Sequence, residues 1–272
     1  IDGACDDSYV LKRTWTATDN CGNETQATQV ITVGDATGPV LAGVPADLEV
    51  ECNNIPSPAN PTATDDCDTD VDISFSETTT PGACENSYIL TRTWIATDNC
   101  GNETVGIQNI TVQDTQEPIL AGIPTDTSAD CNSIPAPPAN VIATDNCDTD
   151  VTIDFSETSA PGACANSSII TRTWTATDNC GNAVSESQKI QVQDTTNPTL
   201  AGVPADATAE CNNIPAIANP TASDNCDVDV TIDFQEIRTD GNCLDNYTLT
   251  RSWTATDNCG NATTEVQIIT VQ

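Results

Sequence analysis

The sequence of 272 residues contains no histidine and no methionine, and only 7 of its residues are lysine or arginine. Without histidine the chain lacks the commonest general base, the commonest zinc ligand and the usual activator of serine or cysteine nucleophiles. The 41 aspartates and glutamates leave a net charge of -34. Because nucleic acids and anionic membrane surfaces bind basic protein faces, this charge excludes both as electrostatic partners.

Long hydrophobic segments are also missing. No run of about 18 apolar residues occurs, so we expect no membrane insertion in this segment, and no signal peptide is recognisable in it. Since the chain begins with Ile1 and has no methionine, we expect it to be a piece of a longer protein.

Cysteine, in contrast, is abundant, with 14 residues. Zinc sites commonly show two cysteines separated by two residues, and the sequence contains no such pair. An even number of cysteines at regular spacing instead predicts a disulfide framework, which persists in oxidising compartments. We therefore expect an extracellular or cell-surface location.

An internal repeat organises the whole chain. The hexapeptide Thr-Asp-Asn-Cys-Gly-Asn recurs about every 80 residues, beginning at Thr18, Thr97, Thr177 and Thr256. We therefore divide the chain into the C-terminal half of a truncated repeat, residues 1–34, and three whole repeats, residues 35–113, 114–193 and 194–272. These segments are called below the half repeat and the second, third and fourth repeats.

Each whole repeat has the pattern of β-strands. Runs rich in β-branched and aromatic residues, such as 71–77 and 87–98, are separated by proline and glycine, and no apolar period of helical type occurs. About 80 residues with some seven short strands match a small Ig-like β-sandwich. A sandwich of this size buries little core, so covalent staples are expected. The sequence thus predicts an all-β fold of tandem, disulfide-stapled Ig-like repeats arranged as a linear rod.

One tryptophan and one arginine recur together in every copy. The arginine precedes the tryptophan by two residues, so both side chains lie on the same face of the predicted strand. We expect each tryptophan to anchor the core, and each arginine to pack its stem on the tryptophan and pair with a neighbouring aspartate. Binding of a sugar or carboxylate by the arginines is the alternative. The residues are Trp15, Trp94, Trp174, Trp253, Arg13, Arg92, Arg172 and Arg251.

The four cysteines of a whole repeat allow three pairings, of which strand geometry discards one. In the second repeat, a single strand after Cys84 would span roughly 40 Å and separate it from Cys100. An antiparallel strand after Cys67 would bring Cys67 beside Cys100, which leaves Cys52 to pair with Cys84. We therefore predict pairs within each repeat, with Cys5 and Cys21 lacking partners: Cys52–Cys84, Cys67–Cys100, Cys131–Cys164, Cys147–Cys180, Cys211–Cys243 and Cys226–Cys259.

The recurring motifs resemble the HYR (hyalin repeat) domain. Asp-x-x-x-Pro opens each whole repeat, Ala-Thr-Asp-(Asn/Asp)-Cys lies in the middle of the second and third repeats, and Trp-x-Ala-Thr-Asp-Asn-Cys-Gly-Asn lies near each repeat end. The motifs are most similar to the four-cysteine variant of this domain, found in tandem in very large surface proteins of Bacteroidota. The resemblance implies an Ig-like sandwich, a role in adhesion or extracellular filaments, type IX secretion and kinship with gliding-motility adhesins.

Aspartates surround the second cysteine of each whole repeat, and an aspartate also lies just before the cysteine of the hexapeptide. If these two cysteines lie close together, the carboxylates share one end of the sandwich with the aspartate that opens the repeat. Calcium takes six to eight oxygens from such flexible loops, so one hypothesis is a calcium site at each repeat joint. The alternative is that these residues form turns and keep the chain soluble. The candidate ligands are Asp35, Asp65, Asp66, Asp68, Asp70, Asp98, Asp114, Asp145, Asp148, Asp150, Asp178, Asp194, Asp224, Asp227, Asp229 and Asp257.

We expect no enzymatic activity, because the acidic residues that could serve catalysis recur in every whole repeat. The sequence predicts a stalk or fibre segment of a large secreted or cell-surface adhesin, whose partners are neighbouring repeats and surface polysaccharide or other cell-surface proteins. Two alternatives stay open. One is a carbohydrate- or protein-binding adhesive module, and the other is a subunit that assembles into filaments by lending strands.

Overall fold

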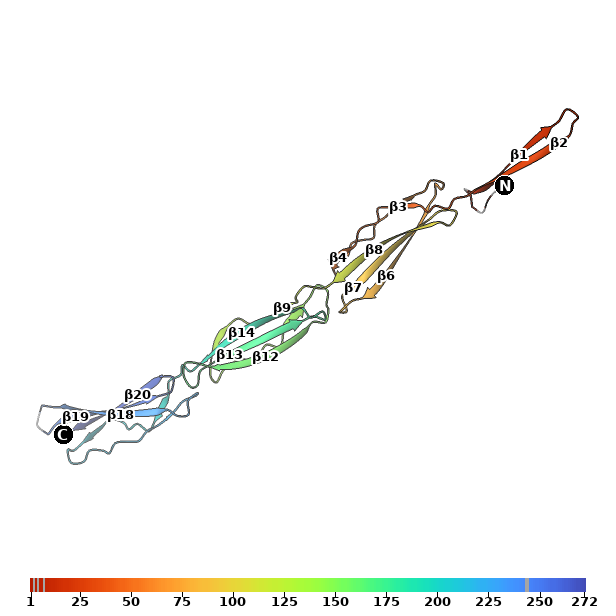
Figure 1. Ribbon diagram of the computed structural model, residues 1–272. Helices are drawn as coiled ribbons and strands as arrows, with labels where there is room; N and C mark the ends of the chain where they lie inside the picture. Colours follow the sequence, from red (N-terminus) through yellow and green to blue (C-terminus); the bar gives the residue numbers. More distant parts are fainter. Residues whose placement is uncertain (2, 4, 7, 243–244) are drawn as a thin grey trace. The chain divides into compact units, whose positions relative to one another are not determined.

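The computed structural model describes residues 1–272 except 2, 4, 7, 243 and 244. Two compact units make up the described chain. The first contains Ile1–Pro118, Thr144–Val151 and Thr177–Ala183, and the second contains Ile119–Ala143, Thr152–Ala176 and Val184–Gln272. The regular elements of the described residues are all β-strands (Figure 1), which confirms the predicted all-β fold. The described part of the chain has no helix long and apolar enough to cross a membrane.

The first compact unit contains the half repeat and the second repeat. In the half repeat, β1 (Tyr9–Thr18) and β2 (Glu24–Val33) form an antiparallel hairpin. In the second repeat a four-stranded sheet has the order β4-β8-β7-β6, and a second sheet pairs β3 with β5. The strand bounds are β3 Val40–Ala42, β4 Leu48–Glu51, β5 Thr62–Thr64, β6 Asp72–Pro81, β7 Tyr88–Thr97 and β8 Glu103–Gln113. The repeat is thus built of six strands rather than the expected seven.

The same two sheets recur in the strands that follow. Their orders are β10-β14-β13-β12 with β11-β9, and β16-β20-β19-β18 with β15-β17. The first set has the bounds β9 Ile119–Ala121, β10 Thr127–Asp130, β11 Ile142–Thr144, β12 Thr152–Pro161, β13 Ser168–Thr177 and β14 Ala183–Gln193. The second set has the bounds β15 Thr199–Ala201, β16 Ala207–Ala209, β17 Thr221–Ser223, β18 Thr231–Asp240, β19 Tyr247–Thr256 and β20 Ala262–Val271.

The long strand β7 carries the core of the second repeat. Its side chains alternate between buried and partly exposed, as the sequence pattern predicts. Leu90 packs with Ile110 and Val112 in one buried cluster. The hexapeptide then turns the chain into β8, and Gly101 adopts a φ of 84° in this turn, a conformation that favours glycine.

Three of the four tryptophans lie in the core. Trp94, Trp174 and Trp253 are 1–3 % exposed, and each contacts a phenylalanine ring about 5 Å away. The expectation that Trp15 is a core anchor is wrong, because this residue is 55 % exposed. The described half repeat is a hairpin with no second sheet to cover the indole.

The arginine before each buried tryptophan is also buried, but its partner is not an aspartate. Arg92 is 3 % exposed; its Nε donates to Glu77 on the neighbouring strand β6 at 2.8 Å, and Nη2 donates to the Pro56 carbonyl at 2.7 Å. Arg172 and Arg251 repeat this arrangement with Glu157 and Glu236. The predicted aspartate partner is therefore corrected to a cross-strand glutamate. Arg13 is exposed in the hairpin of the half repeat.

The disulfides join successive repeats rather than cysteines of one repeat. Each closes a sequence separation of 95 or 96 residues and lies within one compact unit. The first unit contains Cys5–Cys100, Cys52–Cys147 and Cys84–Cys180, and the second unit contains Cys131–Cys226 and Cys164–Cys259.

The predicted pairs Cys52–Cys84, Cys67–Cys100, Cys131–Cys164, Cys147–Cys180 and Cys226–Cys259 are therefore wrong, as is the expectation that Cys5 lacks a partner. The loops around Cys67 and Cys100 do meet, since Asp72 lies opposite Thr97 in the β6–β7 ladder. However, Asp68 already joins the two loops by accepting the Asn99 amide at 2.8 Å, and the Cys100 sulfur bonds to the preceding repeat. The predicted pair Cys211–Cys243 includes Cys243, which lies outside the described residues.

We predict that Arg92→Ala lowers the local opening free energy of the β6–β7 ladder by about 2 kcal/mol, because it removes two charge-assisted hydrogen bonds from a buried position. Amide hydrogen exchange of the two strands measures this effect. The matched control is Arg13→Ala in the exposed hairpin, which should change protection by less than about 0.5 kcal/mol. Equal effects of the two substitutions would contradict the structural role of Arg92.

Candidate metal centre

Three aspartates from separate segments meet in the first compact unit. Asp114 directly follows β8, Asp145 follows β11, and Asp178 follows β13. One carboxylate oxygen of each lies within 4.8 Å of the others. The three residues, called here the first aspartate trio, belong to the set predicted from sequence as calcium ligands.

The hydrogen bonds of the first aspartate trio leave two buried oxygens without a partner. Asp178 accepts from the Cys180 amide and from Asn182, and Asp145 Oδ1 accepts the Cys147 amide at 2.8 Å. Oδ2 of Asp114 and Oδ2 of Asp145 are buried and have no hydrogen-bond partner among the described residues. Since buried polar atoms nearly always have a partner, these two oxygens point to a ligand that the protein itself does not supply.

Electrostatics support the same conclusion. Asp114 is only 7 % exposed. Burial raises the pKa of its carboxyl, opposed by the Gln116 amide hydrogen bond and reinforced by the negative charges of Asp145, Asp178 and Glu51. Among the described ion pairs none links a basic side chain to this trio. A bound cation would therefore relieve a repulsion that no basic side chain of the described residues offsets by an ion pair.

The arrangement recurs in the second compact unit. Carboxylate oxygens of Asp194 and Asp224 lie within 4.8 Å of each other and of the Cys226 sulfur, and Oδ2 of both aspartates is buried without a partner. Burial raises the pKa of Asp194, and so do the charges of Asp224, Asp257 and Asp130. Asp194 and Asp224, together with Asp257, which is grouped with them through this charge interaction and not through the 4.8 Å distance, are called here the second aspartate trio.

A partial version involves the half repeat boundary. Asp35 and Asp65 approach within 4.8 Å of each other and of the Cys67 sulfur, and Asp35 Oδ2 is buried without a partner. Asp98 accepts hydrogen bonds from Cys100 and Asn102 within its own turn. Burial is individually the largest effect and raises the pKa of its carboxyl, but the hydrogen bonds from Asn102, Cys100 and Gly101 together lower this pKa below its ordinary value.

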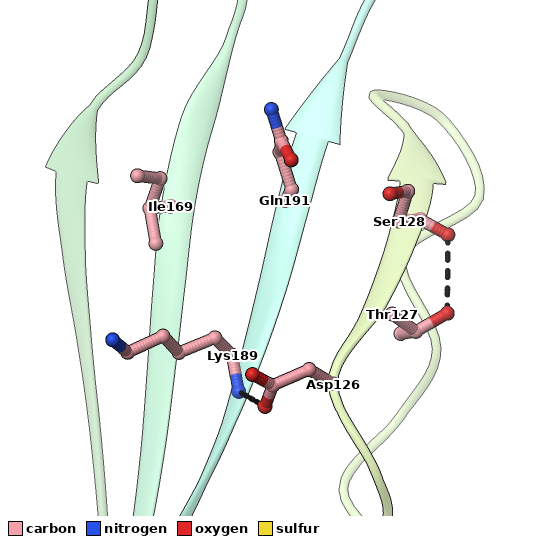
Figure 2. Close-up of a pocket in the computed structure, with 6 residues that line it drawn as sticks. All are labelled: Asp126, Thr127, Ser128, Ile169, Lys189 and Gln191. Atoms are coloured by element: carbon pink, nitrogen blue, oxygen red, sulfur yellow. Dashed lines mark hydrogen bonds between the residues drawn. The ribbon is translucent and has the colours of Figure 1, made fainter.

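A pocket of the second compact unit lies away from these aspartates. Figure 2 shows it across the strands β10, β14 and β13 of the four-stranded sheet, lined by Asp126, Thr127, Ser128, Ile169, Lys189 and Gln191. Asp126 accepts the Lys189 backbone amide at 2.7 Å, so its carboxylate serves the pairing of β10 with β14. The lining residues include no aromatic ring on which a sugar could stack.

Comparison with known families bears on one repeat directly. Residues 199–271 match the family model described as a HYR-like domain with 4 cysteines. The expected resemblance is therefore confirmed for the HYR-like segment 199–271. No curated protein matches the chain.

Solved structures give only weak likenesses. The protocadherin γB4 extracellular domain has 15 % identity and a TM-score of 0.37, covering 98 % of this chain and 55 % of that chain. Protocadherin γB2 cadherin domains 1–5 have 12 % identity, a TM-score of 0.33, and coverages of 98 % and 66 %. Drosophila N-cadherin EC1-4 has 13 % identity, a TM-score of 0.30, and coverages of 98 % and 84 %. The chain spans about half of the first of these structures, and scores this low support no functional argument.

The remaining predicted ligands fall into two groups. Asp68, Asp148 and Asp227 are buried, but each accepts two backbone amides, one of them from the asparagine after the hexapeptide aspartate. These residues clamp two loops of one repeat together. A second group is exposed at loop surfaces and does not enter either trio: Asp66, Asp70, Asp150 and Asp229.

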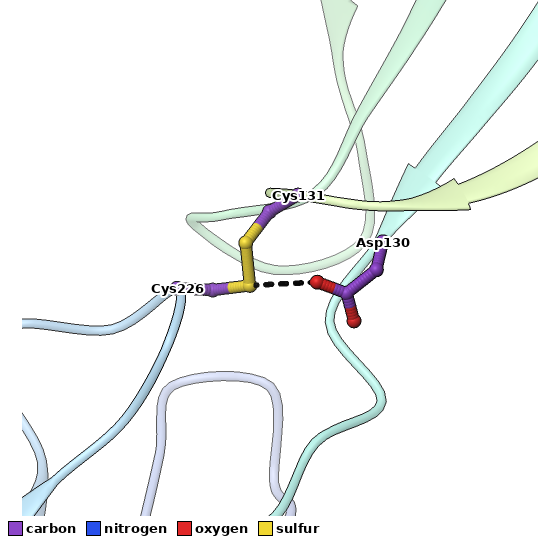
Figure 3. A group of neighbouring side chains, drawn as sticks. All are labelled: Asp130, Cys131 and Cys226. Carbon is purple, nitrogen blue, oxygen red and sulfur yellow. Dashed lines mark hydrogen bonds between the residues drawn. A yellow bond between two sulfur atoms is a disulfide. The ribbon is translucent and has the colours of Figure 1, made fainter. Parts of the chain in front are cut away.

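Sequence reasoning missed the acidic residue before the first cysteine of each repeat. Glu51 lies within 4.8 Å of Asp114 and of the Cys147 sulfur, and Asp130 lies beside the Cys131–Cys226 bond (Figure 3). An acidic residue stands at this position in every whole repeat, as Glu51, Asp130 and Glu210. That recurrence was a usable signal, but pairing the cysteines within one repeat placed these acids far from the joint.

We predict that Asp148→Ala lowers the protection of the Asn179 amide against hydrogen exchange by about 2 kcal/mol, because that amide loses its charged acceptor. Asp150→Ala, which changes an exposed aspartate of the same loop, is the control and should shift protection by less than about 0.5 kcal/mol. An unchanged Asn179 amide in the Asp148 variant would refute the clamp.

Proposed function

We propose that this chain is a non-enzymatic structural segment, a stalk or fibre, of a large secreted or cell-surface adhesin. Its units are the half repeat 1–34 and the repeats 35–113, 114–193 and 194–272. In this proposal successive repeats are joined by disulfides and by calcium bound at the aspartate trios. The observation that supports this proposal most strongly is that all five described disulfides join one repeat to the next.

Disulfides between repeats support a mechanical role. A bond that closes about 95 residues restricts the unfolded chain and, on the chain-entropy model, contributes about 4 to 5 kcal/mol. Such bonds also transmit tension from one repeat to the next without relying on small hydrophobic cores. Five of them support an oxidising, extracellular location as well.

Calcium is the proposed ion because the donors are hard carboxylate oxygens on loops. Asp114, Asp145 and Asp178 would hold one ion, and Asp194, Asp224 and Asp257 another. The cysteine sulfurs near these groups are already in disulfides, which argues against a thiolate site for a soft metal.

The wider setting follows from the sequence motifs. The HYR-like match of residues 199–271 supports an extracellular adhesion-type module. The resemblance of the repeats to Bacteroidota surface proteins extends the proposal to type IX export, kinship with gliding-motility adhesins, and contact with surface polysaccharide or other surface proteins. Recurrence of each acidic residue in successive repeats supports a structural rather than a catalytic use.

Asp114→Asn in the full chain tests the calcium site, because its expected effect on thermal stability has opposite signs in EDTA and in calcium. In EDTA the substitution should raise the midpoint of the first thermal transition, because it removes a desolvated charge that faces Asp145, Asp178 and Glu51. At a calcium concentration of about 100 times the dissociation constant, the variant should lack the stabilisation of about 2.7 kcal/mol that the ion at this site gives the parent chain. Calorimetric titration should show one calcium ion fewer than the parent.

Glu117→Gln is the matched control, since it removes an exposed carboxylate three residues away. It should leave the calcium stoichiometry unchanged. If the thermal midpoint of the parent chain does not change when calcium is added, the calcium part of the proposal is contradicted. The proposal of a stalk joined by disulfides would not be affected by this result.

A further inference from the structure

The three residues of the first aspartate trio all belong to the third repeat, residues 114–193, and Glu51 of the second repeat lies beside Asp114. Glu51 ends β4, and Asp114 follows β8, the parallel neighbour of β4 in the sheet of the second repeat. Asp145 and Asp178 lie on loops of the third repeat. The carboxylates therefore form two pairs, Glu51 with Asp114 at the end of the sheet of the second repeat, and Asp145 with Asp178 on the loops of the third repeat.

The sheet of the second repeat positions the pair formed by Glu51 and Asp114. Glu51 lies opposite Gln113 in the β4–β8 ladder, and the Cys52 amide donates to the Gln113 carbonyl at 3.1 Å. The Glu51 carboxylate accepts the Thr115 hydroxyl at 2.6 Å and the Thr115 amide at 3.2 Å. Its orientation toward the chain after Asp114 is thus set before any ion binds.

The Cys52–Cys147 disulfide crosses the joint between these pairs. Cys52 is the neighbour of Glu51, and the Cys147 amide donates to Asp145 Oδ1 at 2.8 Å. The Cys147 sulfur lies within 4.8 Å of carboxylate oxygens of both Glu51 and Asp114. The disulfide therefore connects Glu51 of one carboxylate pair to Asp145 of the other through only Cys52, Cys147 and Asn146.

The second compact unit repeats this construction. Asp130 ends β10 opposite Gln193, just before Asp194, and the Cys131–Cys226 bond joins it to the loop that begins at Asp224. Figure 3 shows the Asp130 carboxylate turned toward the Cys226 sulfur, 3.5 Å away. The same order of acidic residue, cysteine and partner loop occurs in both compact units, which indicates that these groups do not lie close together by chance.

We propose that the acidic residue before the first cysteine completes a four-carboxylate calcium site, and that the disulfide between repeats preorganises this site. Glu51 fills this role in the first unit and Asp130 in the second. The inference rests on the proposed calcium function. A site whose halves are already tied together loses less conformational entropy on binding, so the disulfide should raise calcium affinity without contacting the ion.

The test uses the full chain with Asp35→Asn and Asp194→Asn as background, so that calorimetry reports only the site at Asp114. Cys52→Ser with Cys147→Ser removes the disulfide without leaving either of its two cysteines as an unpaired thiol. Glu51→Gln removes the fourth carboxylate and keeps the disulfide. We expect each change to weaken calcium binding by about tenfold.

Matched controls separate these effects from general loss of charge or covalent links. Glu49→Gln changes an exposed carboxylate on the same strand, and Cys5→Ser with Cys100→Ser removes a disulfide at a joint whose site is disabled. Both should keep the affinity of the background within about twofold.

Three outcomes are informative. A disulfide variant that folds by circular dichroism and binds calcium within about twofold of the background would overturn the coupling. If that variant does not fold, Glu51→Gln decides, and an affinity equal to that of Glu49→Gln would overturn the inference. Absence of calcium binding in the background chain itself would instead contradict the underlying calcium site.

Discussion

The covalent bonds between sulfur atoms of successive repeats are the constraint on which the rest of the molecule depends. One buried hydrophobic cluster of the second repeat consists of Leu90, Ile110 and Val112, and Trp94 and Ala96 are buried as well. A core this small supplies limited stability. The bonds instead connect loops 95 or 96 residues apart, so much of the restriction on the unfolded chain arises between repeats.

This placement of the sulfur atoms also explains where the negative charge gathers. The loops that carry these cysteines also contain aspartates that accept backbone hydrogen bonds in turns, and the Cys52–Cys147 and Cys131–Cys226 bonds lie beside carboxylates of both repeats that they join. Asp114 and Asp194 are buried as a result, and their pKa values are raised by burial and by neighbouring charges. In the proposed calcium site, a bound cation would offset this concentration of negative charge.

Local features could be predicted from the sequence, whereas connections between repeats could not. The alternation of Leu90, Arg92 and Trp94 predicts one buried face of β7, because side chains on a strand alternate with a fixed period. Meeting of the Asp68 and Asn99 loops follows from the antiparallel ladder. Pairing of Cys52 with Cys147 does not, since strand geometry within one repeat carries no information about the face that the next repeat covers.

Disulfide mapping tests the central claim most directly. The chain would be digested by an aspartate-specific protease without reduction, and linked peptides would be sequenced by mass spectrometry. We predict peptides that join Cys52 to Cys147 and Cys84 to Cys180. Peptides that join Cys52 to Cys84 would contradict covalent linkage of successive repeats and with it the preorganised cation site.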